Sequence, residues 1–324
     1  MREQKRLNSF ALGIDGGGSK TRAVVVDAQG NECGRGLADS SNYNTVGVER
    51  AIEHIRAAVE EAVMRAGCSL PVKVAWLGLA GIDRPADHDR LLPHLRFIAE
   101  SVRLTNDAEL VLGALEEKAG VAVIAGTGSI VWGQDGRGRV ERTGGWGHVF
   151  GDEGSGYDLG RRALQAAAKA ADGRGPETSL LKLILHHWNL ASPDEMIGKV
   201  YGDNDTAAIA GLSSLVFQAA NEGDRTAYKI MQEAVRELVH AIVTVAGRLD
   251  LQEKALSLAL GGGLLLNEAR FRSLMLRSID KHLAIEQVVF VEQPALSAAR
   301  AALSIPGERT QTWNTPTLPT PPTA

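Results

Sequence analysis

Short uncharged apolar runs along the chain alternate with stretches in which apolar residues recur three or four positions apart. The first pattern predicts strands and the second predicts helices. The strands predicted in this way are 10–15, 21–27, 32–37, 72–79, 102–105, 121–125, 130–133, 139–142, 254–260 and 287–291. The predicted helices are 45–66, 86–97, 107–118, 267–281 and 295–304, and the residues from 155 to 249 are mostly helical in pattern. This mixture of elements predicts an α/β fold.

One order of elements occurs twice in the chain. A strand, a glycine turn, a second strand, a polar turn and a third strand begin at about residue 11 and again at about residue 121. The repetition predicts a duplicated α/β domain, and 324 residues suit two domains. We place the domains at 1–115 and 116–293. The residues from 306 to 324 hold five of the chain's 11 prolines and are predicted to be a disordered tail.

The charge and the cysteine content narrow the function classes. The chain has 35 Lys and Arg against 39 Asp and Glu, a formal net charge of −4, which gives no electrostatic reason to expect nucleic acid or an anionic membrane as partner. The N-terminus lacks a signal-peptide pattern, and the apolar runs are too short to span a bilayer. Two cysteines, Cys33 and Cys68, suit a reducing compartment. We expect a cytoplasmic protein.

The first glycine turn lies in Leu12–Thr21, which reads LGIDGGGSKT. It is not a P-loop, because Ser19 separates the last glycine from the lysine and a strand pattern follows. It is not a dinucleotide fingerprint either, because Thr21 occupies the last glycine position. What remains is a glycine hairpin with a carboxylate before it and polar donors after it.

Such a hairpin suits polyphosphate, because backbone N–H groups without neighbouring side chains can face anionic oxygens. The residues that would do this are Gly16, Gly17, Gly18, Ser19, Lys20 and Thr21. Asp15 is placed to hold Mg²⁺ through water. The turn Gly126-Thr127-Gly128-Ser129 offers the same chemistry in the second half. An ordinary tight hairpin remains the alternative for either turn alone, whereas two hairpins facing one another across a cleft would form a phosphate site.

Asp107, in Thr105-Asn106-Asp107, follows a predicted strand and opens a predicted helix. One interpretation is that it caps this helix. The other is that its carboxylate, at a cleft between the halves, orients and deprotonates a substrate hydroxyl that attacks phosphorus. The sequence leaves both open.

A glycine-rich loop, TGGWGHVFGDEGSG, occupies residues 143–156. Trp146 offers an apolar face for a sugar ring, and Asp152 and Glu153 offer acceptors for hydroxyl groups. The alternative is that Asp152, Glu153 and Ser155 only cap the following helix. His148 stands without a cysteine cluster, which favours a structural role over metal binding.

The ordered motifs together resemble the BadF/BadG/BcrA/BcrD-type ATPase family and, within it, the N-acetylglucosamine kinases. The motifs that carry the resemblance are LGIDGGGSKT, TNDA, AGTGS, GGWGHVFGDEGSGYDLG and LGGGLLLN, and they span residues 10–305. The GGWG and GDEGS segments are the most specific, because glycine hairpins are common to all actin-like ATPases. The resemblance implies a duplicated ribonuclease H-like fold, with two domains around a cleft and a terminal helix, about 294–305, returning to the first domain.

The resemblance also implies roles for individual residues. Asp107 matches the catalytic base, and Asp15 lies near Mg²⁺. Thr127 and Gly128 match the second phosphate loop. Residues that match sugar contacts are Asn42, Asp107, Gly145, Trp146 and Asp152, although Asn44 lies close enough to Asn42 to leave that assignment open. The segment Gly261-Gly262-Gly263 matches the adenosine motif.

The function implied is an ATP- and Mg²⁺-dependent kinase that phosphorylates the 6-hydroxyl of an amino sugar, with N-acetylglucosamine the first choice. Glucosamine and N-acetylmuramic acid remain alternative substrates. The resemblance also implies a homodimer as the assembly. A branch of the family that activates partner enzymes uses cysteines to hold an iron–sulfur cluster, and Cys33 and Cys68 lie outside any such motif. An ATPase acting on a partner and a sugar sensor without catalysis are the competing functions from other classes.

Overall fold

The computed structural model describes residues 10–82, 84–115, 119–203, 205–253 and 255–304. The chain divides into two compact units. The first unit contains residues 1–117 and 291–324, and the second contains residues 118–290. Within the described residues, no helix combines the length and the apolar character needed to cross a membrane. The predicted tail at 306–324 lies outside the described residues.

The first unit is built on a five-stranded sheet in the order β3-β2-β1-β4-β5. The β1–β2 and β2–β3 pairs are antiparallel, whereas β1–β4 and β4–β5 are parallel. Its strands are β1 (Ala11–Gly16), β2 (Lys20–Val26), β3 (Glu32–Asp39), β4 (Val72–Leu79) and β5 (Ala99–Thr105). Its helices are α2 (Tyr43–Val46), α3 (Val48–Ala66), α4 (Pro85–Leu95), α5 (Asp107–Leu112) and α14 (Pro294–Ala302).

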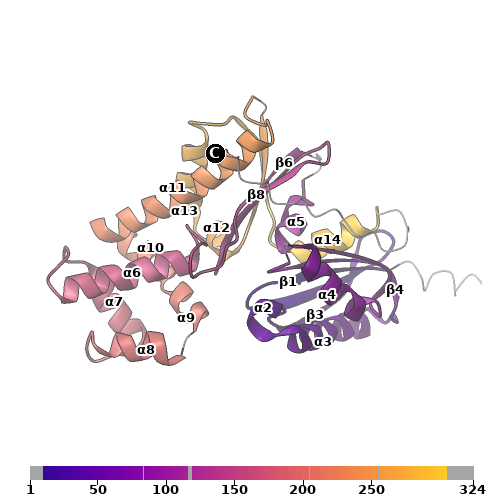
Figure 1. Cartoon of the computed structure of the whole chain (residues 1–324), viewed down its shortest axis with the longest axis horizontal. Helices are drawn as coiled ribbons and strands as arrows, with labels where there is room; N and C mark the ends of the chain where they lie inside the picture. The colour runs from indigo at the N-terminus through magenta and orange to yellow at the C-terminus, as the bar shows by residue number, and fades with distance from the viewer. Residues whose placement is uncertain (1–9, 83, 116–118, 204, 254, 305–324) are drawn as a thin grey trace, which may run out of the picture. The chain divides into compact units, whose positions relative to one another are not determined.

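Alternation along β1 sets the layers of this unit. Leu12 and Ile14 belong to a core cluster with Ile55 of α3, while Ala11 belongs to a separate cluster with Ala295 of α14. Successive strand residues point to opposite faces, so a single strand contributes to both cores. Figure 1 shows α3 and α14 on opposite sides of the first sheet.

The second unit repeats this sheet in the order β10-β9-β6-β7-β8. Its strands are β6 (Ala119–Ala125), β7 (Ser129–Asp135), β8 (Val140–Gly144), β9 (Leu256–Gly261) and β10 (Ile285–Phe290). Its helices are α6 (Gly156–Ala171), α7 (Ser179–His187), α8 (Glu195–Asp203), α9 (Thr206–Gly211), α10 (Ser213–Asn221), α11 (Arg225–Arg248), α12 (Gly263–Asn267) and α13 (Ala269–Ile279).

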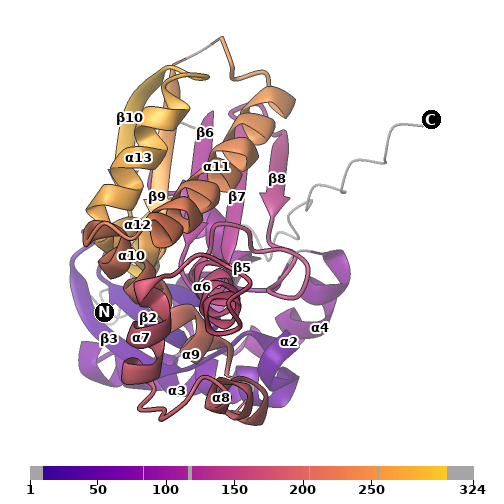
Figure 2. The ribbon, with the colours of Figure 1, turned by 90° about the vertical axis from the view of Figure 1, so that its left-hand side faces the viewer.

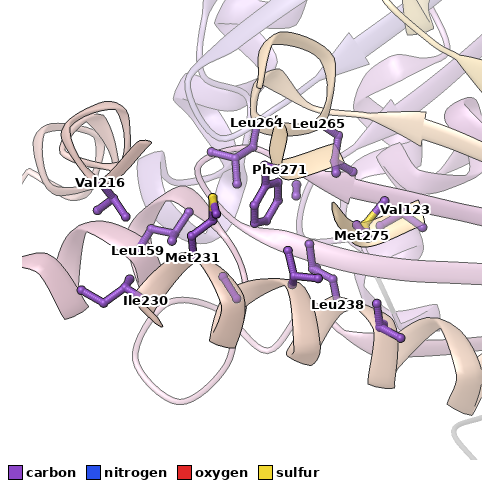
Figure 3. Close-up of a cluster of buried hydrophobic side chains, with 14 of the residues drawn as sticks. Val123, Leu159, Val216, Ile230, Met231, Leu238, Leu264, Leu265, Phe271 and Met275 are labelled. Carbon is purple, nitrogen blue, oxygen red and sulfur yellow. The ribbon is translucent and has the colours of Figure 1, made fainter. Parts of the chain in front are cut away.

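The core of the second unit lies between its sheet and two helices. Figure 2 shows α11 and α13 across one face of the sheet. The side chains that fill this space come from β6, α6, α11 and α13, and Val123, Leu159, Leu238 and Phe271 are among those labelled in Figure 3. The 3.6-residue period of apolar positions along α11 produces this one-sided burial.

Three predicted helices differ from the observed ones. The helix expected at 45–66 is two helices, because Gly47 takes a φ of 83° between α2 and α3. The helix expected at 267–281 runs from Ala269 to Ile279, and Asn267 instead ends the short helix α12. The helix expected at 107–118 ends at Leu112, and residues 116–118 lie outside the described residues.

Candidate active site

The carboxyl ends of three parallel strands gather the polar residues of the first unit. In the sheet register Asp15 of β1 lies opposite Gly78 of β4, and Gly78 lies opposite Thr105 of β5. Open α/β sheets bind their ligands at this edge. Asp15 and the segment that follows Thr105 therefore share the edge expected to face a substrate.

Asp107 is the first residue of α5 and is half-buried. The cap of α5 is Asn106, whose Oδ1 accepts from the backbone N–H of Ala108 at 2.7 Å and of Glu109 at 3.3 Å. The sequence analysis allowed for Asp107 as the cap; the structure gives that task to its neighbour. The catalytic role of Asp107 at the strand end stays a prediction.

The end of β5 is fixed by a buried hydroxyl. Thr105 is 1% exposed, and its Oγ1 accepts a hydrogen bond of 2.9 Å from the indole N–H of Trp76. Trp76 is itself covered by the guanidinium of Arg103, which lies 3.7 Å from the ring centroid. This packing holds the backbone from which Asp107 projects. Preorganisation of this kind is what a catalytic carboxylate needs.

Asp15 is the carboxylate before the first glycine turn. Burial raises the pKa of Asp15 to about 6, and the cationic Arg22, 3.7 Å away, only partly opposes that rise. Burial makes ionisation of Asp15 costly, and Arg22 offsets only part of that cost. A further cation would therefore stabilise the ionised carboxylate. The described residues contain no group of three or more metal-ligating side chains. A single carboxylate suits Mg²⁺ that keeps most of its water and substrate ligands.

The turn between β1 and β2 is open on its outer side. Its backbone closes through a 2.9 Å hydrogen bond from the N–H of Gly17 to the carbonyl of Lys20. Gly18, Ser19 and Lys20 are exposed. A Cβ added at Gly18 would meet no atom within 4 Å, and its φ lies outside the left-handed region. Neither packing nor backbone geometry within the unit therefore requires glycine there, and the space around Gly18 is open to a ligand.

Thr21 differs from its expected place beside phosphate. Its side chain is fully buried, and its Oγ1 donates a 2.6 Å hydrogen bond to the carbonyl of Asp39 on β3. The hydroxyl therefore joins β2 to the segment that leads into the Ser40–Asn44 loop. The phosphate contact expected of Thr21 stays a prediction.

The Ser40–Asn44 loop lies against the loop that follows β4. Asn42 is half-buried and caps α2, its Oδ1 accepting from the N–H of Asn44 at 3.1 Å. The exposed Asn44 donates from Nδ2 to the carbonyl of Gly81 at 3.2 Å. Asn44 thus ties the two loops together, and Asn42 keeps its own Nδ2 available for a ligand. Of the two asparagines, this geometry favours Asn42 as the sugar contact.

Ser41 is a residue that the sequence analysis missed. It is fully buried, its Oγ has no hydrogen-bond partner among the described residues, and it packs where a Cβ on Gly16 would lie. Buried hydroxyls without partners are rare and call for an explanation. The sequence did offer one signal for Ser41, because it lies next to Asn42, which the family resemblance implies as a sugar contact.

In the second unit, the Gly126–Ser129 turn is held by the start of α6. The N–H groups of Gly156 and Tyr157 donate to the carbonyls of Gly126, at 2.8 Å, and Thr127, at 3.1 Å. The hydroxyl of Ser129 donates to the carbonyl of Glu153 at 2.8 Å. Thr127 remains exposed. These hydrogen bonds hold the turn in place and leave the hydroxyl of Thr127 accessible to a ligand.

Asp152 lies beside this turn in a left-handed conformation, with a φ of 57°. Burial raises the pKa of its carboxyl, while the backbone N–H of Ser129 hydrogen-bonds to it and works in the opposite direction. A Cβ on Gly128 would lie 2.9 Å from its Oδ2, so only glycine fits beside the carboxylate without movement. Left-handed geometry at a non-glycine residue concentrates at functional sites.

The alternative that Asp152 and Glu153 only cap α6 is wrong for both residues. The N-cap is Ser155, whose Oγ accepts from the N–H of Asp158 at 3.1 Å, and Asp158 accepts in return from the N–H of Gly154 at 3.1 Å. Glu153 is exposed. The capping is complete without Asp152, whose carboxylate is directed at the turn instead.

Trp146 stands on the same loop and is 52% exposed. Its ring lies 6.3 Å from that of Phe150, and the guanidinium of Arg142 lies 5.1 Å from its centroid. Gly145 joins the loop to the turn through its N–H, which donates to the carbonyl of Ser129 at 3.0 Å. His148 packs edge-on to Tyr157, at 4.9 Å. The loop thus presents an aromatic face to solvent while its base is anchored at the turn.

The Gly261–Gly263 segment meets the same turn. Ile124 of β6 lies opposite Gly261 of β9, so the two parallel strands end side by side. Gly262 has a φ of 86°, and a Cβ there would collide with the backbone of Ala125. The second unit therefore brings together three segments that the sequence analysis singled out: the second turn, the Asp152 loop and the last glycine run. The predicted opposition of the first and second turns across a cleft stays a prediction.

Comparisons with known proteins agree with this geometry. The family model described as "BadF/BadG/BcrA/BcrD ATPase family" matches residues 12–294. The chain is 36% identical over 263 residues to an N-acetylmuramic acid/N-acetylglucosamine kinase of Clostridium acetobutylicum, which covers 80% of this chain and 86% of that protein. It is 31% identical over 312 residues to an N-acetyl-D-glucosamine kinase of Dictyostelium discoideum, with 90% and 97% covered.

A solved structure of a candidate N-acetylglucosamine kinase from Chromobacterium violaceum superposes with a TM-score of 0.75 at 26% identity, covering 91% of this chain and 99% of that one. The expected fold, two repeated units of the actin-like ATPase and sugar kinase type, is confirmed. The chain belongs to the BadF/BadG/BcrA/BcrD ATPase family, and it resembles amino-sugar kinases over most of its length.

Proposed function

We propose that this protein transfers the γ-phosphoryl group of ATP to the 6-hydroxyl of an amino sugar, with N-acetylglucosamine as the expected substrate. The observation that carries the proposal is the position of Asp107 at the carboxyl end of β5, with its capping task taken by Asn106. A carboxylate fixed there can accept the proton of a sugar hydroxyl.

The proposed reaction needs few protein groups to take part in bond making and breaking. The hydroxyl oxygen of the sugar forms a bond to the γ-phosphorus as the bond to the β-phosphate oxygen breaks. The proton of the hydroxyl passes to Asp107, and ADP is the leaving group. Catalysis of this kind depends mainly on positioning and charge neutralisation. Domain closure around the sugar would exclude water.

The two glycine turns are the proposed nucleotide contacts. The exposed Gly18, Ser19 and Lys20 would donate in the first unit, with Gly16 and Gly17 as the other contacts of this turn, and Thr127 and Gly128 would serve in the second. Gly261, Gly262 and Gly263, at the end of β9, are proposed to lie against the adenosine. Asp15 would hold Mg²⁺ through water, and the ion, when bound, neutralises charge on the phosphates.

The sugar is proposed to contact residues of both units. Trp146 would stack on the apolar face of the ring, Asp152 would accept from sugar hydroxyls, and Gly145 would allow close approach. From the first unit, Asn42 would contribute its amide. The choice among N-acetylglucosamine, glucosamine and N-acetylmuramic acid depends on few contacts, each worth about 1–3 kcal/mol.

The test of the activity is an ADP-release assay with Mg²⁺ and ATP across a panel of hexoses and amino sugars. We expect turnover with N-acetylglucosamine to exceed turnover with glucose by at least about tenfold. ADP release that is equal with and without every sugar would instead support an ATPase that serves a partner. Sugar binding without ADP release would support a sensor.

The test of the base is Asp107→Asn, with Glu109→Gln on the same helix as the matched control. We expect Asp107→Asn to lower kcat by roughly 10²–10⁴ while sugar affinity stays within a few-fold. Glu109→Gln should leave kcat within a few-fold. Near-normal turnover of the Asp107 variant would show that Asp107 is not the base. A large loss of kcat in Glu109→Gln alone would point to Glu109 as the base.

A further inference from the structure

One cavity of the second unit is lined by none of the proposed active-site residues. It has a volume of about 960 Å³ and lies between α6, the first turns of α11 and the start of α13. Figure 2 shows α6 and α11 beside one another on one face of the unit. The volume falls within the range of small-molecule sites, about 300–1,000 Å³.

The charge around this cavity is strongly unbalanced. Its lining includes the cations Arg162, Lys169, Arg225, Lys229 and Arg270. Among its described lining residues Glu233 is the one carboxylate, and it is already paired with Arg162 at 2.8 Å. Glu233 also lies four positions after Lys229 on α11, so five cations share one carboxylate in the cavity.

Three of these cations have no protein partner. The side chains of Lys169, Arg225 and Lys229 take part in no ion pair or hydrogen bond among the described residues. Arg225 and Lys229 lie four positions apart on α11, where like charges are neighbours and repel one another. Lys169 faces the same cavity from α6. An anion in the cavity would relieve this repulsion.

The cavity also has an organised wall. Ile230, labelled in Figure 3, is 7% exposed and anchors α11 in the core beneath the cavity. Arg270 lies 5.6 Å from the ring centroid of Tyr228, and its Nη1 donates to Oδ1 of Asn221 at 2.6 Å. Arg270 is therefore held in place at the rim, whereas the lysines remain able to reach a ligand.

We propose that this cavity binds a small molecule with two or more phosphate groups. Cations on two different helices suit a ligand with separated anionic groups better than a single monovalent ion. Ammonium and guanidinium groups are the usual partners of phosphate oxygens. The site is independent of the proposed kinase chemistry, because its residues and those of the glycine turns do not overlap.

The test uses inorganic pyrophosphate as the probe, with EDTA present and at about 50 mM salt, where screening is weak. Calorimetric titrations are made in a Lys20→Gln background, which weakens the proposed phosphate contact of the first turn. The cavity variant is Lys169→Gln with Lys229→Gln. The matched control is Lys182→Gln with Lys281→Gln, which removes two exposed lysines of the same unit that do not line the cavity.

We expect the cavity variant to bind pyrophosphate at least about tenfold more weakly than the background, and the control to stay within about twofold. Amide hydrogen exchange in the background protein should slow in residues 162–169 and 225–233 when pyrophosphate is added. Equal losses of pyrophosphate affinity in both double variants would show that binding depends on the overall positive charge of the unit and would overturn the cavity as the site. Unchanged exchange in those two segments would overturn the site even if the cavity variant failed to fold.

Discussion

The two units share one sheet but treat their glycine turns differently. The strand order β3-β2-β1-β4-β5 of the first unit is repeated as β8-β7-β6-β9-β10 in the second. The Gly126–Ser129 turn is braced by the N-terminus of α6 and by Asp152. The Gly16–Ser19 turn has open space on its outer side. The base of the first turn is also held, since the hydroxyl of Ser40 donates to the carbonyl of Gly17 at 3.2 Å and the N–H of Ala80 donates to that of Gly16 at 2.7 Å. Duplication therefore supplied two similar scaffolds, which differ in that the tip of the first turn is exposed whereas Asp152 covers Gly128 in the second.

The strand ends before the turns differ as well. The first strand of the first unit carries Asp15 one residue before its end, whereas the corresponding strand of the second unit ends in Ile124 and Ala125. The carboxylate beside the second turn, Asp152, comes from the loop before α6 and not from the strand. The proposed metal contact therefore lies at a strand end in the first unit alone.

The largest effect is expected from Asp15→Asn. It should lower kcat/KM for Mg-ATP by about 10²-fold, because a neutral amide cannot hold the water shell of Mg²⁺ as a carboxylate does. Steady-state kinetics at varied Mg²⁺ would measure this. Asp27→Asn, at an exposed turn after β2, is the control and should leave these constants unchanged. If the two variants behaved alike, the asymmetry between the strand ends would have no role in catalysis.

A smaller effect is expected from Trp146→Ala. It should raise the KM for the sugar by about tenfold with kcat within a few-fold, because the stacking face is lost while the catalytic carboxylate is untouched. Val149→Ala is the matched control, since Val149 is 82% exposed on the same loop. An unchanged sugar KM would make Trp146 a structural residue and would weaken the positioning role of the second unit.

The two glycine turns can be compared directly by adding one methyl group to each. Gly128→Ala should lower the free energy of unfolding by about 1–2 kcal/mol, because its Cβ would press on Asp152. Gly18→Ala should change that free energy by less than about 0.5 kcal/mol, but raise the KM for ATP several-fold. Urea denaturation and ATP-dependent kinetics measure both quantities. Equal loss of stability in the two variants would remove the distinction between a braced and an open turn.

The smallest effect on activity is expected at Glu109, which lies 3.4 Å from Arg103. Burial raises the pKa of Glu109 from 4.5 to about 7 in the folded protein. The folded state therefore binds a proton that the unfolded state releases, so wild-type stability should fall as the pH rises from about 4.5 to 7. At about 1.4 kcal/mol per pKa unit, a rise from 4.5 to about 7 corresponds to a loss of roughly 3–4 kcal/mol.

Glu109→Gln should remove most of this slope and make the first unit more stable than the wild type at pH 8. Urea denaturation at pH 5.5 and pH 8 measures the difference. Glu60→Gln, an exposed change in the same unit, is the control and should keep the wild-type slope. A steeper slope in the Glu109 variant would contradict the assigned direction of the pKa shift.

Local patterns in the sequence were sufficient for the strands, the repeat and the two glycine turns. Apolar runs such as Val121–Ala125 form strands in any context that buries them, and their order revealed the duplication. The helix boundaries were less certain, because Gly47 interrupts a helix whose apolar period continues through it.

The roles of single polar side chains were decided only by tertiary structure. The sequence suggested Asp107 as a possible cap of its helix, and the hydrogen bonds of the folded protein give that role to Asn106. Thr21 follows the glycine turn, yet β3 supplies a partner that buries its hydroxyl. The reason is physical: a residue's type sets which hydrogen bonds it can form, whereas distant segments such as β3 and the start of α6 determine which of them it forms.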